Sequence, residues 1–259
     1  MKKIIITLLT LILAVSLFAF TGCNKKETLT VYTNSGFPPF EYTQGTDVVG
    51  VDMDIAKAIA DELGMELDIK DVTFESVIAG ISGDNTIGLA GLSITPDRAA
   101  VVDFSIPYYN TIQYVIYPST GAGTLTVNVD NKVDGSQLAG KDLGVQTSTT
   151  GDTLATDESV SGGLFEGATV KQYDDALVAT DAIGSGCDYV IIDHLTAVQI
   201  VANSTGFSCS EIQGLTIEYY AVAVKKGNTE LLATVNAVIQ KLLDDGTIEQ
   251  WLEDHAASV

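Results

Sequence analysis

Short apolar runs alternate along the chain with segments whose apolar residues recur at helical spacing. The clearest predicted strands are residues 29–33, 65–72, 87–92, 142–146, 169–173 and 189–192. The clearest predicted helices are residues 52–63, for which Asp52 is a candidate cap, and residues 73–82, 174–183 and 195–202. Because strands that alternate with helices form βαβ units, the pattern predicts an α/β fold with parallel sheets.

This alternation occurs twice. Residues 119–124, which are rich in glycine, serine and threonine, interrupt it, and it starts again near residue 142. A further strand is predicted at residues 217–225, and two more helices follow, one from Asn228 and one around Trp251. The pattern therefore predicts two α/β units, and it leaves open which of them contains the C-terminal helices.

Composition and charge narrow the class of protein. The chain has 259 residues, of which 46% are hydrophobic, so it is long enough for one large or two modest domains. Its net charge of −21 argues against nucleic acid, which binds to positively charged surfaces. The few histidines and cysteines show no metal-ligand spacing, and we expect neither a metal nor a cofactor. Cys187 and Cys209 could form a disulfide outside the cytoplasm or remain as two thiols.

The N-terminus has the pattern of a targeting segment. Two lysines precede an apolar run at residues 4–20, and small residues then lead to Cys23. A cysteine directly after Thr-Gly resembles a bacterial lipobox. We therefore predict a lipoprotein signal peptide at residues 1–22, lipidation of Cys23 and a short tether at residues 23–28. Ordinary signal cleavage and an uncleaved anchor are the alternatives.

A candidate anion site lies where the predicted strand 87–92 ends and a short helix begins. Thr95 can cap that helix, and Pro96 suits its first position. Arg98, in the first turn, adds a forked cation beside the N–H groups of the helix start, and this combination suits a carboxylate. The carboxylate could belong to a ligand or to a nearby aspartate of the protein, and the local sequence does not decide between them.

Other candidate groups follow predicted strands in the same way. The loop at residues 147–150 offers hydroxyl and N–H groups at a helix start, which also suit an anion. Asp193 ends a buried strand, where ligands of open α/β sheets bind, and its carboxylate suits an ammonium group. Phe37, beside two prolines, and Phe74, at a helix start, could contact a ligand. Helix capping and core packing are the structural alternatives for these residues.

Together these groups match the zwitterionic head of an α-amino acid and its side chain. Arg98 and two helix starts suit the carboxylate, Asp193 suits the ammonium group, and the phenylalanines offer apolar contact. The sequence contains no Gly-x-Ser-x-Gly elbow and no histidine arranged as the base of a nucleophile. We therefore expect a binding site without catalytic residues.

Several motifs, in order, resemble one family of proteins. They are residues 32–42 (YTNSGFPPFEY), 50–60, 91–98, 103–109, 188–193 and 221–227. From about residue 28 onward the chain resembles the polar-amino-acid family (family 3) of extracytoplasmic solute-binding proteins, which deliver ligands to ATP-binding-cassette (ABC) importers. The resemblance implies a type II periplasmic-binding-protein fold: α/β, with two Rossmann-like lobes that have parallel-type central sheets and are joined by two crossovers. Lobe 1 would be residues 29–110 plus 219–259, and lobe 2 residues 111–218.

The resemblance also implies a set of ligand-binding residues. Arg98 would hold the α-carboxylate with help from lobe 2, Asp193 would hold the α-ammonium group, and two phenylalanines would flank the side chain. The full implied set is Asn34, Phe37, Phe74, Gly91, Leu92, Ser93, Arg98, Gln146, Thr149, Thr150 and Asp193. Asn34 is uncharged where family members that bind basic amino acids often have aspartate. This weakens a lysine or arginine assignment without excluding it, since Glu41 is near in sequence.

The resemblance thus implies an extracytoplasmic, lipid-anchored receptor for a free L-amino acid that is polar or charged. Its expected partners are the permease subunits of an ABC importer and, through the lipid on Cys23, the membrane. We expect a monomer that does not bind nucleic acid. The alternative is an enzyme on the same fold that resembles cyclohexadienyl or arogenate dehydratases, but the sequence points to no general acid for such a reaction.

Overall fold

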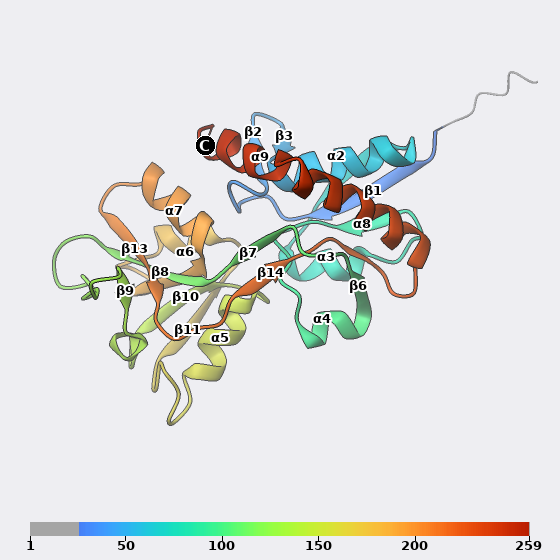
Figure 1. The fold of residues 1–259 in the computed structure, drawn as a ribbon. Helices are drawn as coiled ribbons and strands as arrows, with labels where there is room; N and C mark the ends of the chain where they lie inside the picture. The colour runs from blue at the N-terminus through green and yellow to red at the C-terminus, as the bar shows by residue number, and fades with distance from the viewer. Residues whose placement is uncertain (1–25, 259) are drawn as a thin grey trace, which may run out of the picture.

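The computed structural model describes residues 26–258, which form two lobes around separate β-sheets (Figure 1). In the first sheet, β1 (Thr28–Thr33) lies between β4 (Glu66–Asp71) and β5 (Thr86–Gly88) and is parallel to both. Alternate residues of β1, among them Leu29 and Val31, are fully buried. Next to β5 lie β15 (Ala223–Lys225) and then β6 (Val102–Phe104), both paired antiparallel.

The second sheet combines a parallel half with an antiparallel half. Its strands, in order across the sheet, are β11 (Thr169–Tyr173), β10 (Asp142–Gln146), β12 (Tyr189–Asp193), β8 (Gln113–Pro118), β13 (Phe207–Ile212) and β9 (Lys132–Val133). The first three are parallel, whereas β8 is antiparallel to both of its neighbours. The fold class is therefore as predicted, but both sheets are mixed and not wholly parallel.

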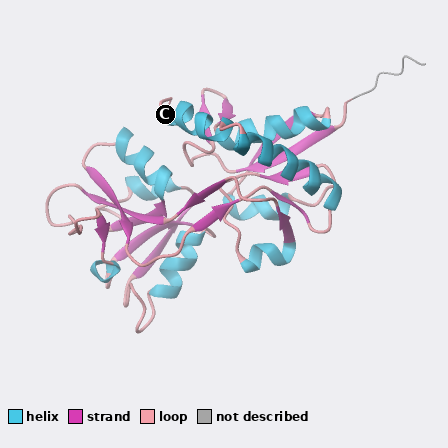
Figure 2. Cartoon of the chain, viewed as in Figure 1, coloured by secondary structure: helices cyan, strands magenta, loops and turns pink. Residues whose placement is uncertain are grey.

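Helices cover both faces of each sheet (Figures 1 and 2). Those of the first lobe are α2 (Val51–Leu63), α3 (Phe74–Gly80), α4 (Pro96–Val101), α8 (Thr229–Asp244) and α9 (Thr247–Ala256). Those of the second lobe are η1 (Gly135–Leu138), α5 (Thr150–Glu158), α6 (Ala176–Asp181) and α7 (His194–Asn203). The C-terminal helices α8 and α9 pack on α2, which answers the question that periodicity left open.

Two antiparallel segments connect the lobes. They are β7 (Tyr109–Thr111) and β14 (Glu218–Tyr220), which pair with each other between the two sheets (Figure 1). The predicted strand at residues 217–225 is therefore two strands, β14 and β15, which belong to different sheets. A small hairpin of β2 (Tyr42–Gln44) and β3 (Asp47–Val49) turns at Gly45, which adopts a positive φ of 65°.

Two local predictions require correction, and the question left open for the two cysteines is answered. The strand predicted at residues 87–92 is paired only as far as Gly88, because the chain turns at Gly91, where φ is 53°. Asp52 does not cap α2, whose N-cap is Gly50, but is buried within the lobe. Cys187 and Cys209 are free thiols.

The sheet order explains why no disulfide forms. Cys187 leads into β12, whereas Cys209 lies in β13, and β8 separates the two strands. Two strand spacings are about 9.5 Å, which exceeds the roughly 7 Å limit between the Cα atoms of a disulfide.

Two predictions concern the membrane. The predicted signal peptide and the lipidated Cys23 lie outside the described residues. Across residues 26–258, no helix combines the length and hydrophobicity needed to cross a membrane.

Candidate functional site

One enclosed cavity between the lobes brings together ten of the eleven predicted ligand-binding residues. It has a volume of about 20 Å³ and is lined by Asn34, Phe37, Glu41, Phe74, Ala90, Gly91, Ser93, Arg98, Gln146, Thr149, Thr150 and Asp193. The exception is Leu92, whose side chain is fully buried in the core and whose carbonyl accepts a hydrogen bond from the Ala221 N–H. Beyond Arg98, Thr149 and Thr150, the cavity adjoins a wider groove of about 710 Å³.

Arg98 lies at the start of α4, as the local sequence predicts. The Thr95 hydroxyl accepts a hydrogen bond from the Arg98 N–H at 3.2 Å, which caps the helix. The Arg98 guanidinium donates from Nη1 to the Ser93 carbonyl at 3.0 Å and from Nη2 to the Ser148 carbonyl at 3.2 Å. It therefore spans the cleft, because Ser93 and Ser148 belong to different lobes. Its carbon atom lies 5.2 Å from the centre of the Phe74 ring, within range for a cation–π contact.

Within residues 26–258, no ion pair neutralises the guanidinium of Arg98. Among the described residues, the salt bridges within 4.0 Å involve lysines and His255, and none involves Arg98. Burial lowers the pKa of Arg98, and the negative charges of Glu218 and Asp193 partly offset that shift. Nε and the second hydrogens of Nη1 and Nη2 remain available to a carboxylate.

Asp193 supplies the opposite charge at the end of β12. Only 7% of the residue is exposed, and its Oδ1 atom accepts no hydrogen bond within the described chain. The alternative of helix capping does not hold, since Asp193 occupies the N-cap of α7 but its side chain accepts no hydrogen bond from the N–H groups of that helix. Burial, and then the nearby charge of Glu218, raise the pKa of Asp193 to about 7. A buried carboxylate of this kind would be stabilised by an ammonium group.

The second lobe contributes the loop before α5. Thr149 caps the helix by accepting a hydrogen bond from the Asp152 N–H at 3.2 Å. The loop therefore has, at Thr149, the capping role that was the structural alternative to anion binding. At the end of β10, Gln146 donates from Nε2 to Asn34 Oδ1 at 2.7 Å across the cleft. Gln146 and Asn34 thus form a second direct link between the lobes, beside that of Arg98 and Ser148.

Phe37 packs against the core of the first lobe and also lines the cavity. It is 9% exposed and lies 5.9 Å from the ring of Phe40 and 6.4 Å from that of Tyr220, measured between centroids. Gly91 allows this position, because a Cβ atom at residue 91 would come within 2.8 Å of the Phe37 ring. Phe74, at the start of α3, also lines the cavity, beside the Arg98 guanidinium.

One further group lines this cavity, Glu41, which the local sequence indicates only as a neighbour of Asn34. Only 1% of Glu41 is exposed, and its Oε2 atom accepts no hydrogen bond within the described chain. Its position directly after two prolines and Phe40, in a loop that returns to the sheet, is the one local hint that it turns inward.

A sequence profile of bacterial extracellular solute-binding proteins, family 3, matches residues 29–257. This chain belongs to that family. The arginine-binding extracellular protein ArtP of Bacillus subtilis (strain 168) is 28% identical to it over 94% of each chain.

Solved structures agree with this assignment. The amino acid ABC transporter substrate-binding protein AbpA of Streptococcus pneumoniae, bound to L-arginine, superposes with a TM-score of 0.77 at 30% identity, covering 89% of this chain and 94% of its own. An ancestral arginine-binding protein bound to glutamine superposes with a TM-score of 0.75 at 30% identity, covering 88% and 97%. The protein is thus an amino-acid-binding component of an ABC importer, with the type II fold of its neighbours.

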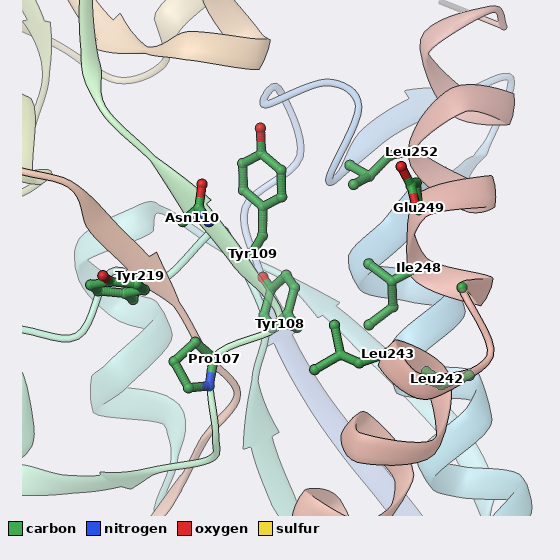
Figure 3. A pocket seen from close by; sticks show the side chains of 11 residues that line it. Pro107, Tyr108, Tyr109, Asn110, Tyr219, Leu242, Leu243, Ile248, Glu249 and Leu252 are labelled. Atoms are coloured by element: carbon green, nitrogen blue, oxygen red, sulfur yellow. The ribbon is translucent and has the colours of Figure 1, made fainter.

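The solute-binding protein has a second, larger cavity, which lies beside the crossover strand β7 (Figure 3). It has a volume of about 520 Å³ and lies between β7 and the helices α8 and α9. Tyr108 and Tyr109 face Leu243, Ile248 and Leu252 there. None of the described residues that line this second cavity is basic, so none of them offers a positive charge to an α-carboxylate.

Proposed function

We propose that this solute-binding protein binds L-arginine between its lobes. The observation that carries the proposal is Glu41, a carboxyl group that is almost fully buried at the cavity and is paired with no base among the described residues. An unpaired buried carboxylate is costly, and a cationic ligand side chain would compensate it. The Phe37 and Phe74 rings beside it suit the flat face of a guanidinium. Two compared proteins, ArtP and AbpA, carry arginine in their names or as bound ligand.

The head group of the ligand would bind at the other end of the cavity. Arg98 would hold the α-carboxylate with Thr149 and Thr150, and Asp193 would hold the α-ammonium group with Ser93. Two observations support these roles. The residues line one cavity, and neither Arg98 nor Asp193 forms a salt bridge within the described chain.

Binding requires the lobes to separate. The enclosed cavity of about 20 Å³ has room for about one water molecule and is too small for an amino acid. We propose that lobe 1 (residues 29–110 plus 219–259) and lobe 2 (residues 111–218) open about the crossover strands and close again on the ligand. The links from Arg98 to Ser148 and from Gln146 to Asn34 would break and re-form in this motion.

We further propose that the protein acts as a lipid-anchored monomer, held at the membrane through Cys23, and that it releases its ligand unchanged. The family match supports a binding role, since its members are solute-binding proteins. Incubation of the purified protein with prephenate or arogenate should yield no dehydrated product by chromatography, and turnover would support the dehydratase alternative.

A thermal-shift screen of the domain against the common L-amino acids tests the choice of ligand. A ligand present at about a hundred times its Kd stabilises the folded state by about 2.7 kcal/mol, which is readily measured. We expect L-arginine to give the largest shift, with L-lysine next. A larger shift with glutamine or histidine than with arginine would refute the proposed ligand, and calorimetry would then identify the preferred one.

A further inference from the structure

Asp52 is a fully buried carboxyl group directly behind the cavity wall. It belongs to α2, and both of its oxygen atoms accept hydrogen bonds. Oδ2 accepts from the Gly91 N–H at 2.9 Å, and Oδ1 accepts from the Tyr108 hydroxyl at 2.8 Å. Tyr108 directly precedes β7, one of the two segments that connect the lobes, and its ring also borders the second cavity (Figure 3).

Glu41 and Asp52 form a buried acid pair. The Asp52 N–H donates to the Phe40 carbonyl at 2.9 Å, which brings the start of α2 against the loop that carries Glu41, and the two carboxyl groups lie together there. The other charged groups that act on Glu41 are Asp71 from β4 and Asp193 from β12, both acidic. Among the described residues that line the cavity, Arg98 is the one with a basic side chain.

Two carboxyl groups in contact away from water do not both ionise readily, and one of them keeps a proton. The hydrogen bonds decide which one. Asp52 has two donors that stabilise its charged form, whereas Glu41 Oε2 has none within the described chain. In agreement, burial raises the pKa of Asp52 only to about 6, whereas burial and the Asp52 charge raise the pKa of Glu41 well above its usual range. These surroundings therefore favour Glu41 over Asp52 as the site of the shared proton.

We propose that Glu41 and Asp52 hold one proton between them in the unliganded protein, and that a cationic ligand side chain drives this proton into solvent while a neutral side chain leaves it in place. This inference rests on the proposed function, because Glu41 must face the ligand side chain. Glu41 would then contact the ligand, and Asp52 would be a positioning residue that acts through Glu41. The guanidinium itself stays protonated, so the released proton comes from the protein alone.

This coupling makes selectivity depend on pH. Protonated Glu41 is a neutral donor that suits the oxygen of a ureido or amide group, whereas ionised Glu41 suits a guanidinium. Between the bound and free pKa values of the pair, each released proton strengthens arginine binding by about tenfold per pH unit. A neutral isostere, L-citrulline, should show no such gain at this end of the cavity.

Calorimetry of L-arginine and L-citrulline in buffers of different ionisation enthalpy counts the protons. Both ligands have the same head group, so any proton exchanged at Asp193 cancels in their difference. We expect arginine to release close to one proton more than citrulline near neutral pH. Equal proton counts would overturn the inference while leaving arginine as the ligand, whereas no binding of arginine would overturn both proposals.

Variants of the acid pair and of a neighbouring acid test whether the difference in released protons arises at Glu41. In Glu41→Gln, arginine and citrulline should exchange equal numbers of protons, and arginine should lose more than tenfold in affinity while citrulline changes little. Asp71→Asn is a matched control, since it removes an exposed acid that acts on Glu41 from outside the pair, and the difference of about one proton should persist. A wild-type proton difference in Glu41→Gln would overturn the inference.

The pH profile of arginine affinity tests the positioning role of Asp52 separately. Tyr108→Phe removes a donor that stabilises ionised Asp52, so the pair should take up more protons and the pH profile of arginine affinity should move to higher pH. A profile in the same place as that of the wild type would overturn the part assigned to Asp52. A uniform loss of affinity at every pH, for both ligands, would indicate a packing defect and would also overturn it.

Discussion

Replacing Arg98 with alanine should remove the carboxylate-binding end of the cavity. Two guanidinium donors are engaged by the Ser93 and Ser148 carbonyls at 3.0 and 3.2 Å, and the remaining ones can make a two-point contact with a carboxylate. Hydrogen bonds between charged groups contribute about 1.5–3 kcal/mol each, so the loss for L-arginine should be about 3 kcal/mol or more. This corresponds to at least a hundredfold weaker Kd, at about 1.4 kcal/mol per factor of ten.

A double-mutant cycle separates this contact from a general disturbance of the site. Agmatine is arginine without the carboxylate, so it should bind the wild type much more weakly, and Arg98→Ala should weaken it little further. Isothermal calorimetry of both ligands on both proteins gives the coupling energy. Asp97→Asn is the matched control, because it changes the neighbouring exposed residue of α4. Equal losses for arginine and agmatine in Arg98→Ala would refute the assignment of Arg98 to the carboxylate.

Further predictions concern polar groups elsewhere in the structure. Burial raises the pKa of Asp193 to about 7, and only its ionised form suits an ammonium group, so citrulline affinity should rise from about pH 6 to about pH 8 in calorimetry. Asp193→Asn should weaken binding and abolish this rise. His255 bonds to Asp54 at 2.7 Å and so ties α9 to α2; His255→Ala should lower the free energy of unfolding by about 1–2 kcal/mol in urea titrations. Both Cys187 and Cys209 should react with a thiol reagent after unfolding without reductant, and no reaction would indicate a disulfide.

Local sequence signals predicted those parts of the fold that depend on local contacts. The cap at Thr95 and the helix that begins at Pro96 are present as predicted, because Thr95, Pro96 and Arg98 interact within one helical turn. The strands β10 and β11 have the predicted bounds, since their apolar runs are flanked by polar loops. Those signals also place Arg98 and Asp193 at the ends of their elements, where an α/β fold gathers its ligand-binding groups.

Features that depend on distant contacts were not predicted from the local pattern. The strand β15 enters the first sheet between β5 and β6, which precede it by more than a hundred residues, and no periodicity encodes that pairing. The same holds for Asp52, whose partners, Gly91 and Tyr108, are 39 and 56 residues away along the chain. From its local sequence Asp52 is a helix cap, and only the tertiary structure shows it as a buried acceptor.

Asn34 illustrates how the structure changes the interpretation of specificity. Its neutral amide weakened the case for a basic ligand in the sequence, on the expectation that this side chain would contact the ligand directly. In the folded protein both ends of the amide are engaged, since Nδ2 donates to the Val72 carbonyl at 2.7 Å and Oδ1 accepts from Gln146 at 2.7 Å.

The amide of Asn34 thus forms part of the contact between the lobes, and a negative charge at this position would share one small cavity with Glu41 and Asp193. A third acid there would raise their pKa values further and favour their neutral forms. On this reasoning, a neutral residue at position 34 keeps Glu41 able to ionise for a cationic ligand, and the absence of an aspartate there does not argue against arginine.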